Sequence, residues 1–179
     1  MTVKIGSPAP DFTLNSTKGK ISLSDYKGKW IVLFTHPADF TPICSTEIPE
    51  FARRAKEFEE LNCQLLGASV DSVFSHIAWI QELEQRTGVK ISFPILADIN
   101  KELAKKYEVY DEESGLSIRG VFIIDPEGKV QYALYHPMNM GRSVVEILRV
   151  LKALQTGGLT PAEWKPGDKL LEPPKTKID

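Results

Sequence analysis

The chain contains little cysteine and little histidine, two and three residues respectively among 179. Two thiols are too few for the disulfide framework of a small secreted protein, so Cys44 and Cys63 each need a separate explanation. The three histidines, His36, His76 and His136, are not spaced as metal ligands usually are. We therefore expect no metal centre and no cofactor.

Neither sign of charge dominates, because 22 basic and 24 acidic side chains leave a net charge of −2. No run of Lys or Arg suggests a surface that follows a phosphate backbone, so we expect no nucleic-acid partner. Long apolar runs are also missing: none approaches the ~20 residues that span a bilayer, and residues 1–12 contain no apolar signal region. We therefore expect a cytoplasmic protein with no membrane partner.

What is present is an alternation of apolar runs and helical patterns. The chain is 42% hydrophobic and 26% charged, which is typical of one globular domain. Residues 30–37, WIVLFTHP, predict a buried central strand that ends at Pro37. Residues 49–62 have helical spacing and residues 64–71 predict a second buried strand, so the three segments form a βαβ unit.

Further along, residues 72–88 predict a helix closed by Gly88, and residues 118–125 and 130–137 predict a β-hairpin around the turn Pro-Glu-Gly-Lys. A last helix is predicted over residues 141–158. The alternation indicates an α/β fold, with a central mixed β-sheet flanked by helices. The inward helix faces are expected to carry Val73, Ile77, Ile80 and Leu83, and then Val144, Ile147, Leu148, Leu151 and Leu154.

The end of the chain is rich in proline. Residues 158–179 carry four of the twelve prolines, so they cannot form a long helix. We expect residues 1–157 to form one domain, and residues 158–179 an extended arm packed on that domain or on a partner subunit.

Cys44 follows a strand end by several residues and precedes an amphipathic helix, so its sulfur is expected in the first helical turn. There, unpaired N–H groups and the helix dipole favour an anion, and a thiol with an ordinary pKa near ~8.5 ionises more readily. The alternative is a small buried apolar residue, as most free cysteines are. The stiff prolines at 37 and 42 and the hydroxyl of Thr41 favour the first interpretation.

The stretch PADFTPIC, residues 37–44, resembles the peroxidatic motif of the peroxiredoxins, the AhpC/TSA family. The resemblance covers almost the whole chain, because APDFTL, STE, GASVDS, FPILAD, IRGVFIID, GRSVVEILR and TPAEWKPGD follow the same order in that family. It implies a thioredoxin-like fold and a thiol-dependent peroxidase. The pair His36-Pro37 resembles the one-cysteine branch of the family in particular.

By this resemblance, Cys44 is the peroxidatic nucleophile, Thr41 holds the peroxide, Pro37 shields the thiolate and Arg119 is the cation over the sulfur. The chemistry gives each role a reason. The sulfur attacks one peroxide oxygen while negative charge develops on the other, and fixed donors must meet that charge. Gly120, next to Arg119, permits a close backbone approach at the same point.

The supporting network implied by the resemblance consists of Glu47, Arg142 and His36. Arg142 is expected in the first turn of the helix that starts near Gly141, where a cation opposes the helix dipole. A carboxylate should compensate it, and Glu47, one turn after Cys44, is the candidate. His36 is expected to be a hydrogen-bonded residue behind the site.

A cysteine that has become a sulfenic acid needs a second thiol for turnover. If residues 44–61 are mostly helical, Cys63 lies on the order of 25 Å away, too far for a disulfide, and is expected to be structural. The common two-cysteine peroxiredoxins have cysteine where this chain has Thr160, whether natural or engineered. We therefore expect a hydroperoxide substrate and an external thiol reductant, either a thioredoxin-like protein or a low-molecular-weight thiol. The family resemblance alone also implies a homodimer or a larger ring.

Two other functions fit parts of the pattern. A thioredoxin-like disulfide oxidoreductase would need a Cys-x-x-Cys pair, and Thr41 stands in place of its first cysteine. A redox sensor or holdase chaperone would use the same oxidisable Cys44 without turnover.

Overall fold

The computed structural model describes residues 3–174. The chain forms two compact units that divide between Arg142 and Ser143, and each is described by itself. The first unit holds the sheet and all the candidate site residues. The sequence predicted another division, between a domain of residues 1–157 and an arm of residues 158–179, and that division stays a prediction.

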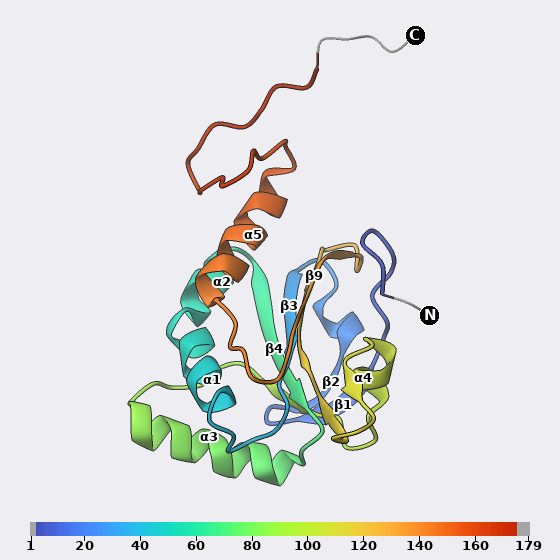
Figure 1. Ribbon diagram of the computed structural model, residues 1–179, viewed down its shortest axis with the longest axis vertical. Coiled ribbons are helices and arrows are strands. Elements are labelled where there is room, and N and C mark those ends of the chain that lie inside the picture. Colours follow the sequence, from blue (N-terminus) through green and yellow to red (C-terminus); the bar gives the residue numbers. More distant parts are fainter. Residues whose placement is uncertain (1–2, 175–179) are drawn as a thin grey trace. The chain divides into compact units, whose positions relative to one another are not determined.

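The first unit contains a seven-stranded mixed sheet in the order β2-β1-β5-β4-β3-β8-β9 (Figure 1). Strands β3, β4 and β5 are parallel, and the other neighbouring strands pair antiparallel. This confirms the α/β prediction, with β3 inside the sheet and the predicted hairpin formed by β8 and β9. The strands are β1 (Thr13–Ser16), β2 (Gly19–Ser22), β3 (Trp30–Thr35), β4 (Cys63–Ser69), β5 (Ile95–Ala97), β8 (Arg119–Ile124) and β9 (Val130–His136), with β6 (Tyr110–Asp111) and β7 (Leu116–Ser117) forming a separate pair.

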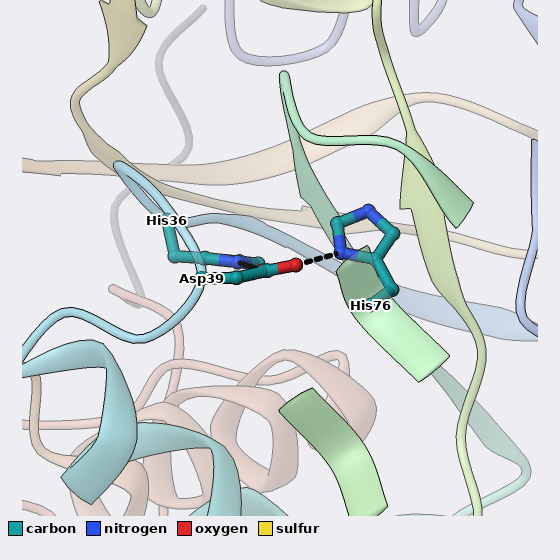
Figure 2. A group of neighbouring side chains, drawn as sticks. All are labelled: His36, Asp39 and His76. Carbon is teal, nitrogen blue, oxygen red and sulfur yellow. Dashed lines mark hydrogen bonds and ion pairs between the residues drawn. The ribbon is translucent and has the colours of Figure 1, made fainter. Parts of the chain in front are cut away.

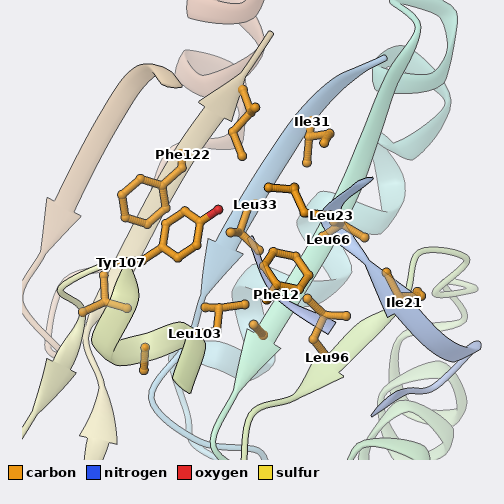
Figure 3. Close-up of a cluster of buried hydrophobic side chains, with 14 of the residues drawn as sticks. Phe12, Ile21, Leu23, Ile31, Leu33, Leu66, Leu96, Leu103, Tyr107 and Phe122 are labelled. Atoms are coloured by element: carbon orange, nitrogen blue, oxygen red, sulfur yellow. The ribbon is translucent and has the colours of Figure 1, made fainter. Parts of the chain in front are cut away.

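Helices lie on both sides of this sheet, and alternate residues of β3 show how each face is covered. Phe34 stacks on Phe51 of α1, with ring centroids 4.0 Å apart. Ile31 and Leu33 belong to the opposite cluster, together with Tyr107, which follows α4 (Figure 3). The helices of this unit are α1 (Cys44–Arg53), α2 (Ala55–Glu60), α3 (Val73–Thr87) and α4 (Glu102–Lys106), with the 3-10 turn η1 (Leu23–Tyr26).

Two details of the predicted helices were wrong. The helix expected over residues 49–62 is divided at Arg54 into α1 and α2. On α3, His76, Trp79 and Leu83 are buried, whereas Ile77 is 41% exposed. The apolar pattern misplaced the buried face because a histidine is buried only where it has hydrogen-bond partners. His76 finds them in two other segments, at the Asp39 carboxylate and the Leu96 carbonyl.

The second unit contains α5 (Val144–Thr156), capped by Ser143 and Gly157. Residues 158–174 form no helix, as expected, but they fold back, because Leu159 and Leu171 pair and Trp164 is 4% exposed. Residues 175–179 of the expected arm lie outside the described part of the chain. No helix among the described residues is long and apolar enough to cross a membrane.

Candidate active site

Cys44 is the first residue of α1, and its side chain is fully buried. The chain reaches it from the carboxyl end of β3 through a loop, residues 36–43, which we call the β3–α1 loop. At the first helical position the backbone N–H has no intrahelical acceptor, and the helix dipole is positive there. The local backbone therefore favours negative charge at this sulfur.

Arg119, the first residue of β8, reaches the same sulfur. Its Nη1 lies 3.2 Å from Sγ of Cys44 and 2.7 Å from Oε2 of Glu47. The opposite side of the guanidinium is fixed as well, because Nε and Nη2 both donate to the carbonyl oxygen of Met138, at 2.9 and 2.7 Å. Since Arg119 is only 2% exposed, its charge acts on the sulfur with little screening by water.

Glu47 joins the two arginines of the site. Its Oε1 accepts from the backbone N–H and Nε of Arg142, both at 2.8 Å, and its Oε2 accepts from Nη2 of Arg142 at 2.8 Å. Arg142 also donates from Nη1 to the carbonyl oxygens of Thr35 and Gly120. Burial acts to raise the pKa of Glu47, but the hydrogen bonds and charge of Arg142, with the charge of Arg119, hold it below its ordinary value.

The expected position of Arg142 was wrong, although the structure places it beside Glu47. α5 begins at Val144 with Ser143 as its N-cap, so Arg142 precedes the helix instead of lying in its first turn. The positive charge of the guanidinium is compensated by the ion pair with Glu47, and Arg142 as a whole is 7% exposed.

The backbone around Arg119 is held by a residue that the sequence did not single out. Thr35, the last residue of β3, donates from its hydroxyl to the carbonyl oxygen of Ile118 at 2.7 Å and accepts from the N–H of Gly120 at 2.9 Å. A Cβ on Gly120 would lie 2.7 Å from Cγ1 of Val109, so any side chain there would force its neighbours to shift. A threonine at a strand end was the only sequence signal for this bridge.

Pro37 and Thr41 both lie on the β3–α1 loop. Pro37 is buried, and Thr41 is partly buried. The Thr41 hydroxyl donates to the carbonyl oxygen of Ala38 at 2.8 Å, and not to the sulfur. Because a hydroxyl has one proton but two lone pairs, Thr41 keeps the capacity to accept a hydrogen bond in the site.

His36 does not join the group around Cys44. It is fully buried, and its Nε2 lies 2.9 Å from Oδ1 of Asp39, whose Oδ2 lies 2.7 Å from Nδ1 of His76 (Figure 2). In the described part of the chain these three residues form the one group close enough to hold a metal ion, and His136 is not a member. Neither Asp39 nor its bonds to His36 and His76 could be expected from the sequence, because His76 is 37 residues from Asp39.

Cys63 lies at the other end of the parallel strands. It is the first residue of β4 and pairs with Trp30, the first residue of β3. Cys44 instead contacts Arg119 of β8, two residues before Val121, which pairs with Phe34 near the last residue of β3. Five steps along a strand span about 17 Å, so the two thiols are far apart. Both are free and buried, and burial raises the pKa of Cys63 to about 12.

In this mixed sheet the parallel strand β3 leads into α1, a helix that starts with a buried cysteine bound by an arginine. This arrangement defines a class: thiol proteins with a thioredoxin-like fold. The AhpC/TSA family model matches residues 5–133, which is most of the chain, and the chain belongs to this family, the peroxiredoxins. Family membership makes it a thiol-dependent peroxidase.

Curated relatives agree with this assignment. Peroxiredoxin 2 of Picrophilus torridus is 54% identical over 100% of this chain and 92% of its own length. The peroxiredoxin of Thermoplasma volcanium is 51% identical over 100% of this chain and 90% of its own.

Solved structures show the same fold. Peroxiredoxin 6 of Arenicola marina, as its C45S mutant, has a TM-score of 0.90 at 35% identity and covers 98% of this chain, which covers 86% of it. The yeast mitochondrial 1-Cys peroxiredoxin has a TM-score of 0.88 at 40% identity, with coverages of 94% and 85%. The predicted thioredoxin-like fold is therefore confirmed.

Proposed function

We propose that Cys44 is the peroxidatic nucleophile of this peroxidase and that Arg119 is the cation that acts on its sulfur and on the bound peroxide. Glu47 and Arg142 hold Arg119 in place. Thr41 contacts the peroxide, Pro37 covers the thiolate and His36 supports the loop from behind. The substrates are hydrogen peroxide and small organic hydroperoxides.

The observation that carries this proposal is the balance of charge around the sulfur. Arg119 and Arg142 bring two buried positive charges, and Glu47 is the only carboxylate among the described residues that pairs with either of them. One positive charge is left over, and an unpaired buried charge is costly. A Cys44 thiolate at 3.2 Å from Arg119 removes the imbalance, whereas a neutral thiol does not.

The reaction follows from this arrangement. The thiolate sulfur attacks one oxygen of the peroxide, an S–O bond forms and the O–O bond breaks, leaving a sulfenic acid and a hydroxide or alkoxide that takes up a proton. The Thr41 hydroxyl, which already donates to Ala38, accepts a hydrogen bond from the peroxide O–H. Arg119 and the Cys44 N–H meet the negative charge that develops on the leaving oxygen.

Reduction of the sulfenic acid falls to an external thiol. Cys63 is too distant and stays protonated, and Thr160 has no thiol. An outside thiol displaces water from the sulfenic acid to form a mixed disulfide, and a second thiol then releases Cys44. The yeast mitochondrial 1-Cys peroxiredoxin resolves its thiol via glutathione and thioredoxin systems, which supports a reductant of either kind here. Since Cys44 is fully buried, the first turn of α1 must open for a bulky thiol to reach it.

We further propose that the protein assembles as a homodimer or a larger ring and works in the cytoplasm. Apolar side chains gather on the β3–α1 loop and on α3, where Phe40 is 57% exposed, Phe74 84% and Ile77 41%. A second copy that covers them would remove this surface from water. The two free cysteines agree with a reducing compartment.

Turnover tests the proposed function. Purified protein should consume many equivalents of hydrogen peroxide with dithiothreitol or a thioredoxin system, and Cys44→Ser should consume none. One stoichiometric oxidation followed by binding of unfolded client proteins would instead support the redox sensor or holdase, which the same oxidisable cysteine also allows.

A further inference from the structure

A buried cluster of three side chains lies beside the active site and has no part in the reaction steps above. Figure 2 shows the Asp39 carboxylate between the imidazoles of His36 and His76. All three side chains are at most 1% exposed. Asp39 and His36 belong to the β3–α1 loop, whereas His76 lies on α3, so the carboxylate joins two separate segments.

The hydrogen bonds of His76 fix how many protons the cluster holds. Its Nδ1 faces Oδ2 of Asp39 at 2.7 Å, and its Nε2 faces the carbonyl oxygen of Leu96 at 3.1 Å. A carbonyl only accepts, so Nε2 carries a proton, and a second proton lies between Nδ1 and Oδ2. Asp39 and His76 together therefore form either an ion pair or a neutral acid and imidazole.

The surroundings favour the ion pair. Burial acts to raise the pKa of Asp39, but the side-chain hydrogen bonds of His36 and His76 outweigh it and hold that pKa far below its ordinary value. The hydroxyl of Ser75 also donates to Oδ2, at 2.9 Å. His36 donates from Nε2 to the other oxygen, and its Nδ1 has no partner among the described residues, which fits a neutral ring whose pKa burial has lowered.

This proton count argues against a metal ion as the occupant of the cluster. A cation bound by His36, Asp39 and His76 would take the positions that two hydrogen-bonding protons occupy. Those bonds already satisfy both carboxylate oxygens and the two nitrogens that face them. The atoms of the three residues that face one another are therefore all hydrogen-bonded, and only the Nδ1 of His36, which faces away from Asp39, has no partner among the described residues.

The cluster holds the loop that carries the proposed peroxide contacts. Besides its side chain, Asp39 donates its backbone N–H to Oδ2 of Asp71 at 3.0 Å, beyond the end of β4. The next residue, Phe40, has φ of 59°, a conformation that costs a bulky residue energy and persists only where the surroundings impose it. Thr41 follows directly, so its place relative to Cys44 depends on how Asp39 is held.

The thiolate contacts come from elsewhere. Arg119 is fixed by Glu47 and by the Met138 carbonyl, and none of its described hydrogen bonds involves the β3–α1 loop. The described hydrogen bonds of His76 reach neither Arg119 nor Cys44. Two separate sets of contacts thus hold the site: those of Arg119 hold the sulfur, and those of Asp39 and His76 hold the β3–α1 loop.

We propose that His76 is a positioning residue for peroxide reduction: bound to Asp39 and to the Leu96 carbonyl, it holds the β3–α1 loop so that Thr41 and Pro37 face the Cys44 sulfur. This inference rests on the proposed function, because it assigns those loop residues to the peroxide. If His76 has this role, its loss should slow the reaction of Cys44 with peroxide, which needs the β3–α1 loop in place. It should not slow alkylation of the Cys44 thiolate, which does not need the loop.

The test compares two reactions of Cys44 at neutral pH in the full chain. One is single-turnover oxidation by hydrogen peroxide, and the other is alkylation by iodoacetamide, which requires the thiolate but no peroxide pocket. For His76→Gln we expect the oxidation rate to fall about tenfold to a hundredfold, as misplaced reacting groups do, with alkylation not slowed. Ser75→Ala, which removes a neutral bond to the same carboxylate oxygen, should oxidise at nearly the wild-type rate.

A double variant guards against simple misfolding. Asp39→Asn/His76→Gln removes the negative and the positive charge together, so no buried charge is left unpaired and the variant should fold. It should oxidise no more slowly than His76→Gln alone. Equal slowing of oxidation and alkylation, an unchanged oxidation rate in His76→Gln, or additive losses in the double variant would overturn the proposal. So would a melting temperature that falls with EDTA and is restored by Zn²⁺, because that result indicates a metal centre.

The wild-type protein distinguishes failure of the proposed function from failure of the positioning role. If it is alkylated but does not react with peroxide, the proposed function fails and the positioning role fails with it. If it reduces peroxide and His76→Gln does so equally well, only the positioning role is lost.

Discussion

The Nη1 of Arg119 lies 3.2 Å from the Sγ of Cys44, and 75 residues separate the two in sequence. The contact joins the first residue of β8 to the first residue of α1. It requires both the strand pairing of β3 with β8 and the loop that turns the chain into α1. A cation fixed at this distance both favours the ionised sulfur and supplies a donor to the peroxide.

Removing this cation should slow the reaction with peroxide strongly. For Arg119→Ala we expect the second-order rate of Cys44 oxidation to fall by about a hundredfold or more, comparable to the loss of a fixed oxyanion donor. Arg86→Ala is a suitable control, because Arg86 is 51% exposed at its side chain and, within residues 3–174, forms an ion pair only with Glu82 on the surface of α3. Stopped-flow oxidation measures both, and equal losses in the two variants would contradict a specific role for Arg119.

Glu47 should make stability depend on acid pH. Its folded-state pKa lies below the ordinary value of 4.5, so the stability that it contributes is complete above that value and is lost as the pH falls through the folded pKa. Glu47→Gln should therefore be less stable than wild type at neutral pH, and the difference should shrink below pH ~4.5. Urea unfolding at several pH values measures this, and a difference that stays constant down to acid pH would contradict the ion pair.

Gly120→Ala should destabilise the fold around Arg119. The added Cβ would lie 2.7 Å from Cγ1 of Val109 and 3.1 Å from Oγ1 of Thr35, so these buried side chains or the strand itself must shift, at a cost of about 1–3 kcal/mol. Gly141→Ala is the matched control, because its nearest neighbour lies at 3.5 Å. Thermal unfolding of the two variants compares the sites. Similar melting temperatures would mean that the packing at Gly120 tolerates a methyl group.

Cys63 should be chemically silent in the folded protein. Burial raises its pKa to about 12, so almost no thiolate is present at pH 7–8. Iodoacetamide should label one cysteine per native chain and two per unfolded chain, with Cys44 the native site, and Cys63→Ala should turn over at the wild-type rate. Peptide mapping by mass spectrometry identifies the labelled residue. Native labelling of Cys63, or a large loss of turnover in Cys63→Ala, would mean that a second thiol takes part.

The proton count of the buried cluster can be read by spectroscopy. In ¹⁵N spectra of the native protein at neutral pH, both ring nitrogens of His76 should carry protons, whereas His36 should carry one. Asp39→Asn provides the comparison, because it removes the charged partner of both rings. A His76 ring with one bare nitrogen in the wild type would contradict the ion pair.

Much of the fold and of the site could be predicted from sequence because the determining signals are local. Apolar runs mark β3, β4 and the β8–β9 hairpin, and the PADFTPIC motif marks Cys44 and its loop. Arg119 could be selected only through the family resemblance, since an arginine at a strand end carries no signal of its own.

The parts that could not be predicted depend on contacts between distant segments. His76 and Asp39 are 37 residues apart, and neither has a local reason to be buried. Helical spacing placed Ile77 inward, because an apolar side chain is the default choice for a buried face and the polar partners of His76 come from other elements. The bridge from Thr35 to Gly120 spans 85 residues and was invisible for the same reason.

The most direct test of the account is trapping of the oxidised sulfur. One equivalent of hydrogen peroxide is added to the reduced protein, and the sulfenic acid is captured with dimedone and located by mass spectrometry. The account predicts rapid modification of Cys44 alone, and none in Cys44→Ser, which also loses thiol-dependent peroxide turnover. Peroxide turnover by Cys44→Ser at the wild-type rate would contradict it.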